Sequence, residues 1–383
     1  MSRPVYLAGE VAGCGRHPAA WRLPGADPAG LFGAGHWIGL AGLAETAGLD
    51  LLVIDDSFAP PPEGHPELVR GRLDAVAVAA RVAPLTTTVG LVPVATTTHT
   101  EPFHLSKAIA TLDFVSLGRA GWQPEVSRTE AEAALFGRKP AAPAGELWRE
   151  AADAVEVVVR LWDSWEDDAV IRDVATGRYV DRDKLHYVDF AGEFFSVKGP
   201  SITPRSPQAH PPVVLRADEP EALPLVGRWA DVARVRAADL PAAEAARRRV
   251  RDAVAAAGRD PDVVAVLLDV PTLLAPTAAE AAATLERLDS WTPDPDPGGV
   301  RSVGTPDALA DLVAEVVAGG AADGVTVQPL TLPDGLRAVA DGVVPLLVER
   351  GLRPAITPAG TLRDRFGLPR PANHFAPPTG ATR

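Results

Sequence analysis

The chain has 383 residues, of which 46% are hydrophobic, so it can bury one large core and is expected to form a single domain over residues 1–383. Its formal net charge of −13 argues against nucleic acid or an anionic membrane as a partner, because an acidic surface repels phosphate. A single cysteine excludes an internal disulfide, and neither a signal peptide nor an apolar run of roughly 18 residues is visible, so a cytoplasmic location is expected.

Apolar, β-branched runs alternate with stretches of helical spacing along almost the whole chain. Eight strands are predicted, at residues 5–8, 50–54, 88–95, 114–116, 212–216, 231–235, 263–271 and 324–328. Helices are predicted between and after them, at residues 37–47, 68–82, 104–112, 145–162, 221–229, 242–256, 306–317 and 336–349. Because eight βα units close into a parallel barrel, the sequence predicts an α/β fold of the TIM (β/α)8 barrel type.

Three segments do not follow this alternation. Residues 163–210 are charged and turn-rich, and loops of this length are usually lids or binding loops. We therefore expect this insertion to lie over the carboxyl-terminal mouth of the barrel. Residues 292–299 are rich in proline and aspartate, and residues 369–383 are predicted to form an extended C-terminal arm.

Polar residues follow the third and fourth predicted strands. Thr96, Thr97 and Thr98 end the third strand, and the strand predicted at residues 114–116 runs into the glycine-containing turn LGRAGW. A TIM barrel builds its active site from side chains at the carboxyl ends of its strands. The pattern therefore predicts a ligand site at this end of the barrel.

Several long strings are distinctive enough to indicate a family. They include HPAAWRLPGADP (17–28), LDFVSLGRAGWQ (112–123), GTPDALADLVAEVVAGGAADG (304–324) and GLRPAITPAGTLRDRFGLPRPANHFA (351–376). The segment from WEDDAVIRDV to GPSITPRSPQ (165–208) belongs with them. Together they resemble the bacterial-luciferase-like superfamily of flavin-dependent monooxygenases, in the branch of the nitrilotriacetate, dibenzothiophene-sulfone and pristinamycin monooxygenases.

That resemblance implies a two-component enzyme. The chain would receive reduced FMN from a separate flavin reductase and use it with O2 to oxidise a small organic substrate. The resemblance assigns Asp56, Thr96, Thr97 and Gln123 to the flavin site, although Asp56 could instead cap the turn that follows it. The sequence GCGRHP lacks the third glycine of a dinucleotide fingerprint, which is consistent with a separate reductase.

Other positions depart from the family pattern. Leu23 replaces a histidine, Val94 a threonine and Trp148 a tyrosine, and leucine cannot transfer a proton. Where the family has a glycine- and serine-rich loop for the FMN phosphate, this chain has Ala217, Asp218 and Glu219 after Arg216. Each carboxylate would cost on the order of 1–3 kcal/mol beside a phosphate, and Arg216 could offset one of them. Alternatively, Asp218 caps a helix and Glu219 is a first-turn acid.

His99 is the candidate for acid–base chemistry, because it follows the threonines at the third strand; it could instead be a turn or lid contact. No metal site is expected, since His99 and His104 have no carboxylate arranged as a third ligand. Cys14 could fill the core or face the flavin, and Trp37, Trp122 and Trp165 could wall a pocket or pack the barrel against its lid.

Two functions remain open. The first is the FMN-dependent monooxygenase, with a small-molecule substrate and a reductase as partners. The second is a divergent homologue with lost or altered flavin binding, which acts as a non-catalytic partner subunit or binds another ligand. A deazaflavin-dependent oxidoreductase is a lesser alternative. In each case the chain is expected to be a homo-oligomer, or a hetero-oligomer with a related subunit.

Overall fold

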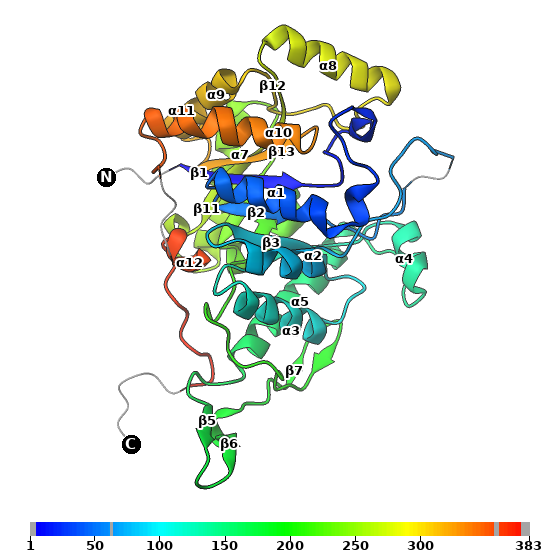
Figure 1. Cartoon of the computed structure of the whole chain (residues 1–383). Helices are drawn as coiled ribbons and strands as arrows, with labels where there is room; N and C mark the ends of the chain where they lie inside the picture. The colour runs from blue at the N-terminus through cyan, green and yellow to red at the C-terminus, as the bar shows by residue number, and fades with distance from the viewer. Residues whose placement is uncertain (1–4, 62–63, 356–359, 377–383) are drawn as a thin grey trace.

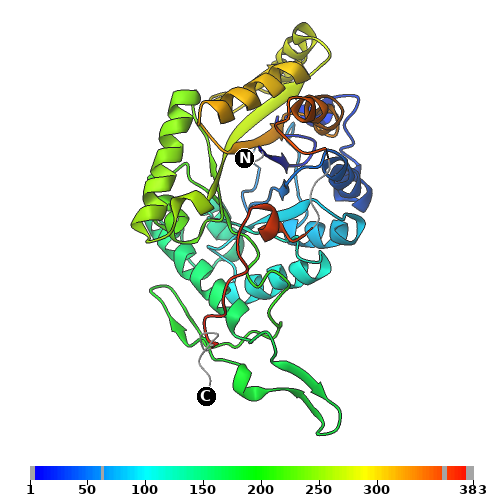
Figure 2. The same cartoon turned by 90° about the vertical axis from the view of Figure 1, so that its left-hand side faces the viewer.

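The computed structural model describes residues 5–61, 64–355 and 360–376. Eight parallel strands in these segments form a barrel, and a bridge between Trp122 and Val213 joins its two outermost strands. The predicted TIM barrel is confirmed (Figures 1 and 2). In their order around the barrel, the strands are β4 (Gln123–Glu125), β3 (Gly90–Thr96), β2 (Leu51–Ile54), β1 (Tyr6–Val11), β13 (Gly324–Pro329), β11 (Ala265–Leu274), β10 (Val232–Val235) and β9 (Val214–Arg216).

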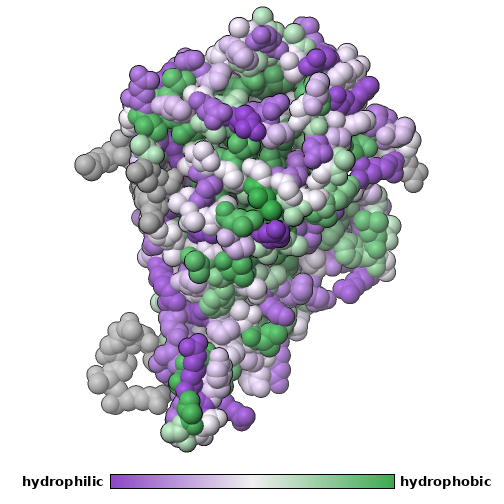
Figure 3. Space-filling view, viewed as in Figure 1, coloured by the Kyte–Doolittle hydropathy of each residue, from purple (hydrophilic) through white to green (hydrophobic). Residues whose placement is uncertain are grey.

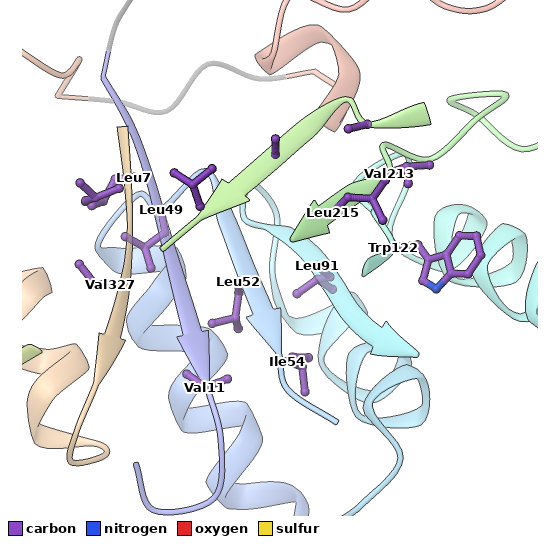
Figure 4. Packing of buried hydrophobic residues seen from close by; sticks show 14 of the residues in the cluster. Leu7, Val11, Leu49, Leu52, Ile54, Leu91, Trp122, Val213, Leu215 and Val327 are labelled. Carbon is purple, nitrogen blue, oxygen red and sulfur yellow. The ribbon is translucent and has the colours of Figure 1, made fainter. Parts of the chain in front are cut away.

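Helices surround the strands. Several of them begin at a residue whose side chain accepts a hydrogen bond from a backbone N–H of the first turn, as Asp74, Asp239 and Thr305 do. Apolar side chains on the outer faces of the strands pack against them, as Leu7, Leu52 and Leu91 do in Figure 4. The helices are α1 (Ala34–Thr46), α2 (Ala75–Val82), α3 (Pro102–Val115), α5 (Ala144–Asp163), α6 (Leu223–Trp229), α7 (Leu240–Ala256), α9 (Pro306–Ala318), α10 (Asp334–Ala338) and α11 (Val344–Glu349).

The amino-terminal half of the barrel interior is apolar and closed. The short helix α12 (Leu362–Arg365) lies across this end (Figure 2). Leu362, Phe366 and Leu368 pack on the inward side chains of the strands, and Phe366 stacks on Tyr6 with ring centroids 4.5 Å apart. A ligand therefore reaches the interior from the carboxyl-terminal mouth.

The strand predicted at residues 114–116 is wrong. Helix α3 continues to Val115, and the fourth barrel strand is β4, nine residues further along than Phe114. The helical spacing of Ile109 and Leu112 continues into the apolar residues that follow, and so short an apolar run does not distinguish a strand from a helix end.

The prediction that residues 163–210 cross the carboxyl-terminal mouth is also wrong. Gln208 Nε2 donates to Asp113 Oδ1 at the end of α3 (2.6 Å) and to Ala120 O before β4 (2.7 Å). The hairpin of β7 (Phe190–Ala191) and β8 (Ser196–Val197) lies along α5, where Glu193 N donates to Asp153 Oδ2 (2.9 Å). The segment joins the end of a helix to the start of a strand, and in a TIM barrel both lie at the amino-terminal face. The hairpin of β5 (Val170–Asp173) and β6 (Arg178–Val180) projects away from the barrel (Figure 1).

Elements that the sequence did not predict stand beside the mouth instead. They are α4 (Glu130–Phe136), α8 (Ala278–Trp291) and β12 (Ser302–Gly304). In the Pro/Asp-rich segment before β12, the Asp296 carboxylate accepts hydrogen bonds from Arg236 and, at 3.0 Å, from Arg16. This segment therefore links the loops that follow β1 and β10.

The described part of the predicted C-terminal arm packs against the insertion. Arg370 pairs with Asp167 at 2.6 Å, and Asn373 Nδ2 donates to the carbonyl oxygens of Asp163 and Trp165, both at 2.8 Å. The remainder of the predicted arm, residues 377–383, lies outside the described residues. Among the described residues, no helix has the length and apolar character needed to cross a bilayer.

Candidate functional site

The carboxyl-terminal half of the barrel interior is charged. Side chains alternate between the two faces of a strand, so the inward apolar residues of the lower half are followed two positions later by inward polar ones. Thus Ala8 precedes Glu10, Val53 precedes Asp55, and Leu267 precedes Asp269. The polar layer comprises Glu10, Asp55, Gln123, Glu125, Arg216, Arg234, Asp269 and Gln328.

Arg234 is the centre of this layer and is fully buried. Its guanidinium makes two parallel hydrogen bonds to Asp269, from Nε to Oδ1 (2.9 Å) and from Nη2 to Oδ2 (2.8 Å). Nη1 lies 2.6 Å from Glu10 Oε2 and donates to Gln123 Oε1 at 2.9 Å. A buried guanidinium with this many acceptors is held rigidly, because every other arrangement leaves a buried charge unpaired.

Arg216 is the second cation of the layer. Its Nη2 donates to Glu10 Oε2 at 2.8 Å, and Gln328 Nε2 donates to the other Glu10 oxygen, also at 2.8 Å. Burial acts to raise the pKa of Glu10, but the charges of Arg234 and Arg216 outweigh it and lower that pKa to about 2. Glu10 is therefore ionised, and it forms an ion pair with each of the two guanidinium groups.

The carboxyl groups of Asp55 and Glu125 are less well balanced by nearby positive charge than those of Glu10 and Asp269. Four carboxylates face two guanidiniums in this layer. Glu10 makes short contacts to both guanidiniums, and Asp269 makes a short contact to Arg234 and a longer one, of 3.4 Å, to Arg216. Burial and the neighbouring Glu10 raise the pKa of Asp55 to about 6, and burial also raises the pKa of Glu125. Asp55 can thus take or release a proton near neutral pH.

Several buried donors have no partner among the described residues, and two of them at the mouth are Gln123 Nε2 and Thr96 Oγ1. Because Arg234 holds Gln123 by its oxygen, the Gln123 amide nitrogen is left free to donate to a ligand. The two other threonines are already used. Thr97 Oγ1 donates to Glu125 O (3.1 Å), and Thr98 Oγ1 accepts from Ser127 N (2.9 Å).

Asp56 lies on the other side of the barrel wall from Asp55. Its Oδ2 accepts from the backbone N–H of Ala75 at 3.0 Å, at the start of α2, and burial raises its pKa. It lines a cavity of about 370 Å³ between α2 and α3, which the end of β3 also borders. Hydrophobic side chains gather on the face that carries these helices (Figure 3). The interpretation of Asp56 as a cap agrees with this contact.

His99 is buried beside α4 and apart from the charged layer. Its ring stacks on Phe136 with centroids 4.8 Å apart, and among the described residues neither ring nitrogen has a hydrogen-bond partner. Burial, helped by the charge of Lys139, lowers its pKa, so the imidazole is neutral at pH 7.

The two acidic side chains of the loop after β9 accept hydrogen bonds from other groups of the protein. Asp218 Oδ1 accepts from Arg236 N at 2.7 Å. Glu219 Oε1 accepts from Arg128 Nη2 at 2.7 Å, and its other oxygen accepts from Trp148 Nε1 at 2.8 Å. Arg128 lies over the Trp148 ring, 5.6 Å from its centroid. Trp148 and Glu219, which both depart from the family pattern, are thus bonded to each other. The Glu219 carboxylate already accepts hydrogen bonds from the donors of Arg128 and Trp148.

A second cavity, of about 390 Å³, opens at the mouth beside Asp55. The loops after β1 and β2 form it, and Trp37 lines it together with Cys14. Burial raises the pKa of the Cys14 thiol. Trp122 packs edge-on against Trp162, and Trp165 Nε1 donates to Ser201 O in the insertion, so neither lines this cavity.

The structure places two of the residues selected from the sequence, Gln123 and Arg216, in this charged layer. Sequence reasoning missed four others, which are Glu10, Arg234, Asp269 and Gln328. The signal was present: in LAGEV, VARV and LLDV, a charged residue interrupts an apolar strand in phase with the inward residues. A charge at such a position must face a partner inside the barrel.

Residues 17–296 match the family described as luciferase-like monooxygenase. The chain belongs to this family. It is 30% identical to the N-acetyl-S-(2-succino)cysteine monooxygenase of Bacillus subtilis (strain 168), over 98% of this chain and 99% of the relative. It is also 30% identical to the nitrilotriacetate monooxygenase component A of Aminobacter aminovorans, over 95% and 96% of the two chains. The predicted branch of the family is therefore confirmed.

A solved structure extends the comparison. The luciferase-like chain superimposes on riboflavin lyase, crystallised with modified FMN and riboflavin, with a TM-score of 0.86 and 26% identity. The match covers 95% of this chain and 96% of riboflavin lyase. The luciferase-like fold thus extends over almost the entire chain.

Proposed function

We propose that this chain is the oxygenase component of a two-component, FMN-dependent monooxygenase, which receives reduced FMN from a separate flavin reductase and oxidises a small organic substrate in the cytoplasm. The observation that carries the proposal is that two buried donors on neighbouring strands, Gln123 Nε2 and Thr96 Oγ1, lack a partner among the described residues in the mouth of a luciferase-like barrel. The name "component A" of one relative is consistent with a separate partner.

These donors fit the polar edge of a flavin ring, which offers carbonyl oxygens and ring nitrogens as acceptors. Gln123 and Thr96 would hold that edge, and Arg234 would keep the Gln123 amide in the donating orientation. Bound reduced FMN would supply the electrons that activate O2. The chain's own residues position the ring and, through Asp55, provide a group that exchanges protons beside the cavity.

A specific observation also favours the second candidate, a divergent subunit with altered flavin binding. Glu219 takes the donors of Arg128 and Trp148, and the loop from Ala217 to Glu219 carries no hydroxyl for a phosphate. We infer that this chain holds the phosphate end of FMN weakly, which is the altered flavin binding that the second candidate requires.

Anaerobic titration with reduced FMN, followed by tryptophan fluorescence and calorimetry, tests the proposal. We expect saturable binding, which Gln123→Leu and Thr96→Val each weaken about tenfold because each removes one hydrogen bond to the ring. Thr111→Val, at an exposed threonine of α3, is the matched control. Absence of saturable binding for both FMN and reduced FMN, or unchanged binding in both mouth variants, would overturn the proposal in favour of the second candidate.

A further inference from the structure

The cavity beside Asp55 has the properties of a small-molecule site. Its volume of about 390 Å³ lies within the usual range for such sites, and it opens at the carboxyl-terminal mouth. The loop after β1 contributes Gly13, Cys14 and His17, and the loop after β2 contributes Asp55 and Arg72. The cavity is thus bounded by loops that a TIM barrel uses for ligands.

Aromatic and aliphatic side chains form most of its wall. Trp21, Trp37 and Phe32 line it. The indole N–H groups are already engaged, since Trp21 Nε1 donates to Glu67 O and Trp37 Nε1 to Leu31 O, both at 2.9 Å. The rings therefore offer their apolar surfaces to a ligand, and such surfaces attract both apolar groups and cations.

The polar groups of the cavity differ in the hydrogen bonds that they already make within the protein. His17 accepts from Ala19 N at Nδ1 (3.1 Å), and its Nε2 lies 3.1 Å from Asp289 Oδ1. Arg72 Nη1 donates to Ser57 Oγ at 2.5 Å on the exposed side. Among the described residues, no side-chain hydrogen bond to the Asp55 carboxyl is found. Asp55 is also the one acid among the described residues that line this cavity.

The charges behind Asp55 favour a cation in front of it. Glu10 and Asp269 pair with Arg216 and Arg234, so these two carboxylates already balance the two positive charges of the layer. At Asp55, burial and the negative charge of Glu10 outweigh the attraction of Arg216, Arg72 and Arg234 and raise its pKa. An ionised Asp55 is therefore under-compensated, and a ligand cation would relieve this.

We propose that this cavity binds an organic amine, whose apolar or aromatic body packs on Trp21, Trp37 and Phe32 and whose ammonium group pairs with the Asp55 carboxylate. The assignment of amines as the substrate class rests on the proposed monooxygenase function. The proposal that the cavity binds an amine does not depend on that function. A polycarboxylate, such as the nitrilotriacetate in the name of one relative, would place its charge against Asp55.

Three probes of equal size and different charge test the inference without flavin: 3-phenylpropylamine, 3-phenylpropan-1-ol and 3-phenylpropionate. By calorimetry near pH 7.5, we expect the amine to bind about tenfold tighter than the alcohol, with the propionate weakest. Asp55→Asn should remove the preference for the amine. Asp56→Asn, a change of the same chemistry at a neighbouring residue on the other side of the strand, should keep it.

The wild-type protein gives a second test that does not depend on the folding of a variant. Amine affinity should fall about tenfold from about pH 7.5 to about pH 5, as Asp55 gains a proton while the amine stays charged, and alcohol affinity should not change. Equal binding of the three probes would overturn the inference, as would tighter binding of the propionate that Arg72→Gln abolishes. Amine binding without flavin binding would instead contradict the proposed function alone.

Discussion

Asp55 and Asp56 are neighbours at the end of β2, and their side chains lie on opposite sides of the barrel wall. Asp55 belongs to the charged layer and borders the mouth cavity, whereas Asp56 accepts a hydrogen bond from Ala75 N at the start of α2. The alternation of side chains along a strand separates them, so two chemically identical residues have different roles. The sequence resemblance selected Asp56 for the flavin, but the structure places Asp55 at the mouth.

Replacement of Asp56 by alanine should destabilise the protein without closing the mouth cavity. The variant leaves the Ala75 N–H of α2 without its acceptor, and the loss of a helix-capping hydrogen bond costs about 1 kcal/mol. Urea unfolding followed by circular dichroism measures this. A variant as stable as the wild type, but deficient in flavin binding, would return Asp56 to the cofactor site.

Asp55 should make the protein less stable as the pH rises. Its pKa is about 6 in the folded state and about 3.9 in an unfolded chain, so between these values the folded state binds more protons. The free energy of unfolding should therefore fall across this window, by on the order of 1–3 kcal/mol in total, and remain lower above it. Urea unfolding of wild type and Asp55→Asn at about pH 4 and about pH 7.5 measures the difference. Parallel pH profiles would show that Asp55 titrates normally.

The fold was predictable because its signals are local. Apolar β-branched runs and helical spacing located seven of the eight barrel strands, whereas residues 114–116 were too short a run to assign. The position of the insertion was predictable in principle, because it follows α5 and precedes β9 and must start at the amino-terminal face. Its length and polarity suggested a lid, and this compositional argument ignored the topology.

The site was less predictable because its contacts join distant segments. The pairing of Arg128 with Glu219 spans 91 residues, and the contact between Arg216 and Glu10 spans 206. Strand alternation could have identified Glu10, Arg234 and Asp269 as inward residues, since each interrupts an apolar strand. It could not have shown which carboxylates take the two guanidiniums and which remain under-compensated, because this depends on strand order and side-chain geometry.

Glu219→Gln should increase the affinity for FMN. Glu219 is the anion that now occupies the donors of Arg128 and Trp148, and its removal would relieve a repulsion on the order of 1–3 kcal/mol toward a phosphate, or about tenfold or more in the dissociation constant. Changing Ala217, Asp218 and Glu219 together to glycine and serines should act in the same direction, although it also removes the Asp218 bond to Arg236 N.

Fluorescence titration with FMN and with riboflavin, at low and high salt, distinguishes this effect from a general one. The gain should be confined to FMN, since riboflavin has no phosphate, and it should be largest at low salt. Glu221→Gln, at an exposed acid two residues away, is the matched control. Tight FMN binding by the wild type, or an equal gain for riboflavin, would mean that Glu219 does not oppose the phosphate.

Arg234→Met should be strongly destabilising, because it removes the buried cation on which the charged layer depends. Asp269 would lose both of its short hydrogen bonds, and Glu10 would retain Arg216 alone as a guanidinium partner. Removing one partner of a buried ion pair typically costs about 3–5 kcal/mol. Arg228→Met, at an exposed arginine paired with Glu156, should cost less than about 1 kcal/mol. Urea unfolding of the two variants at one pH gives the comparison, and equal losses would show that the layer does not depend on Arg234 for its stability.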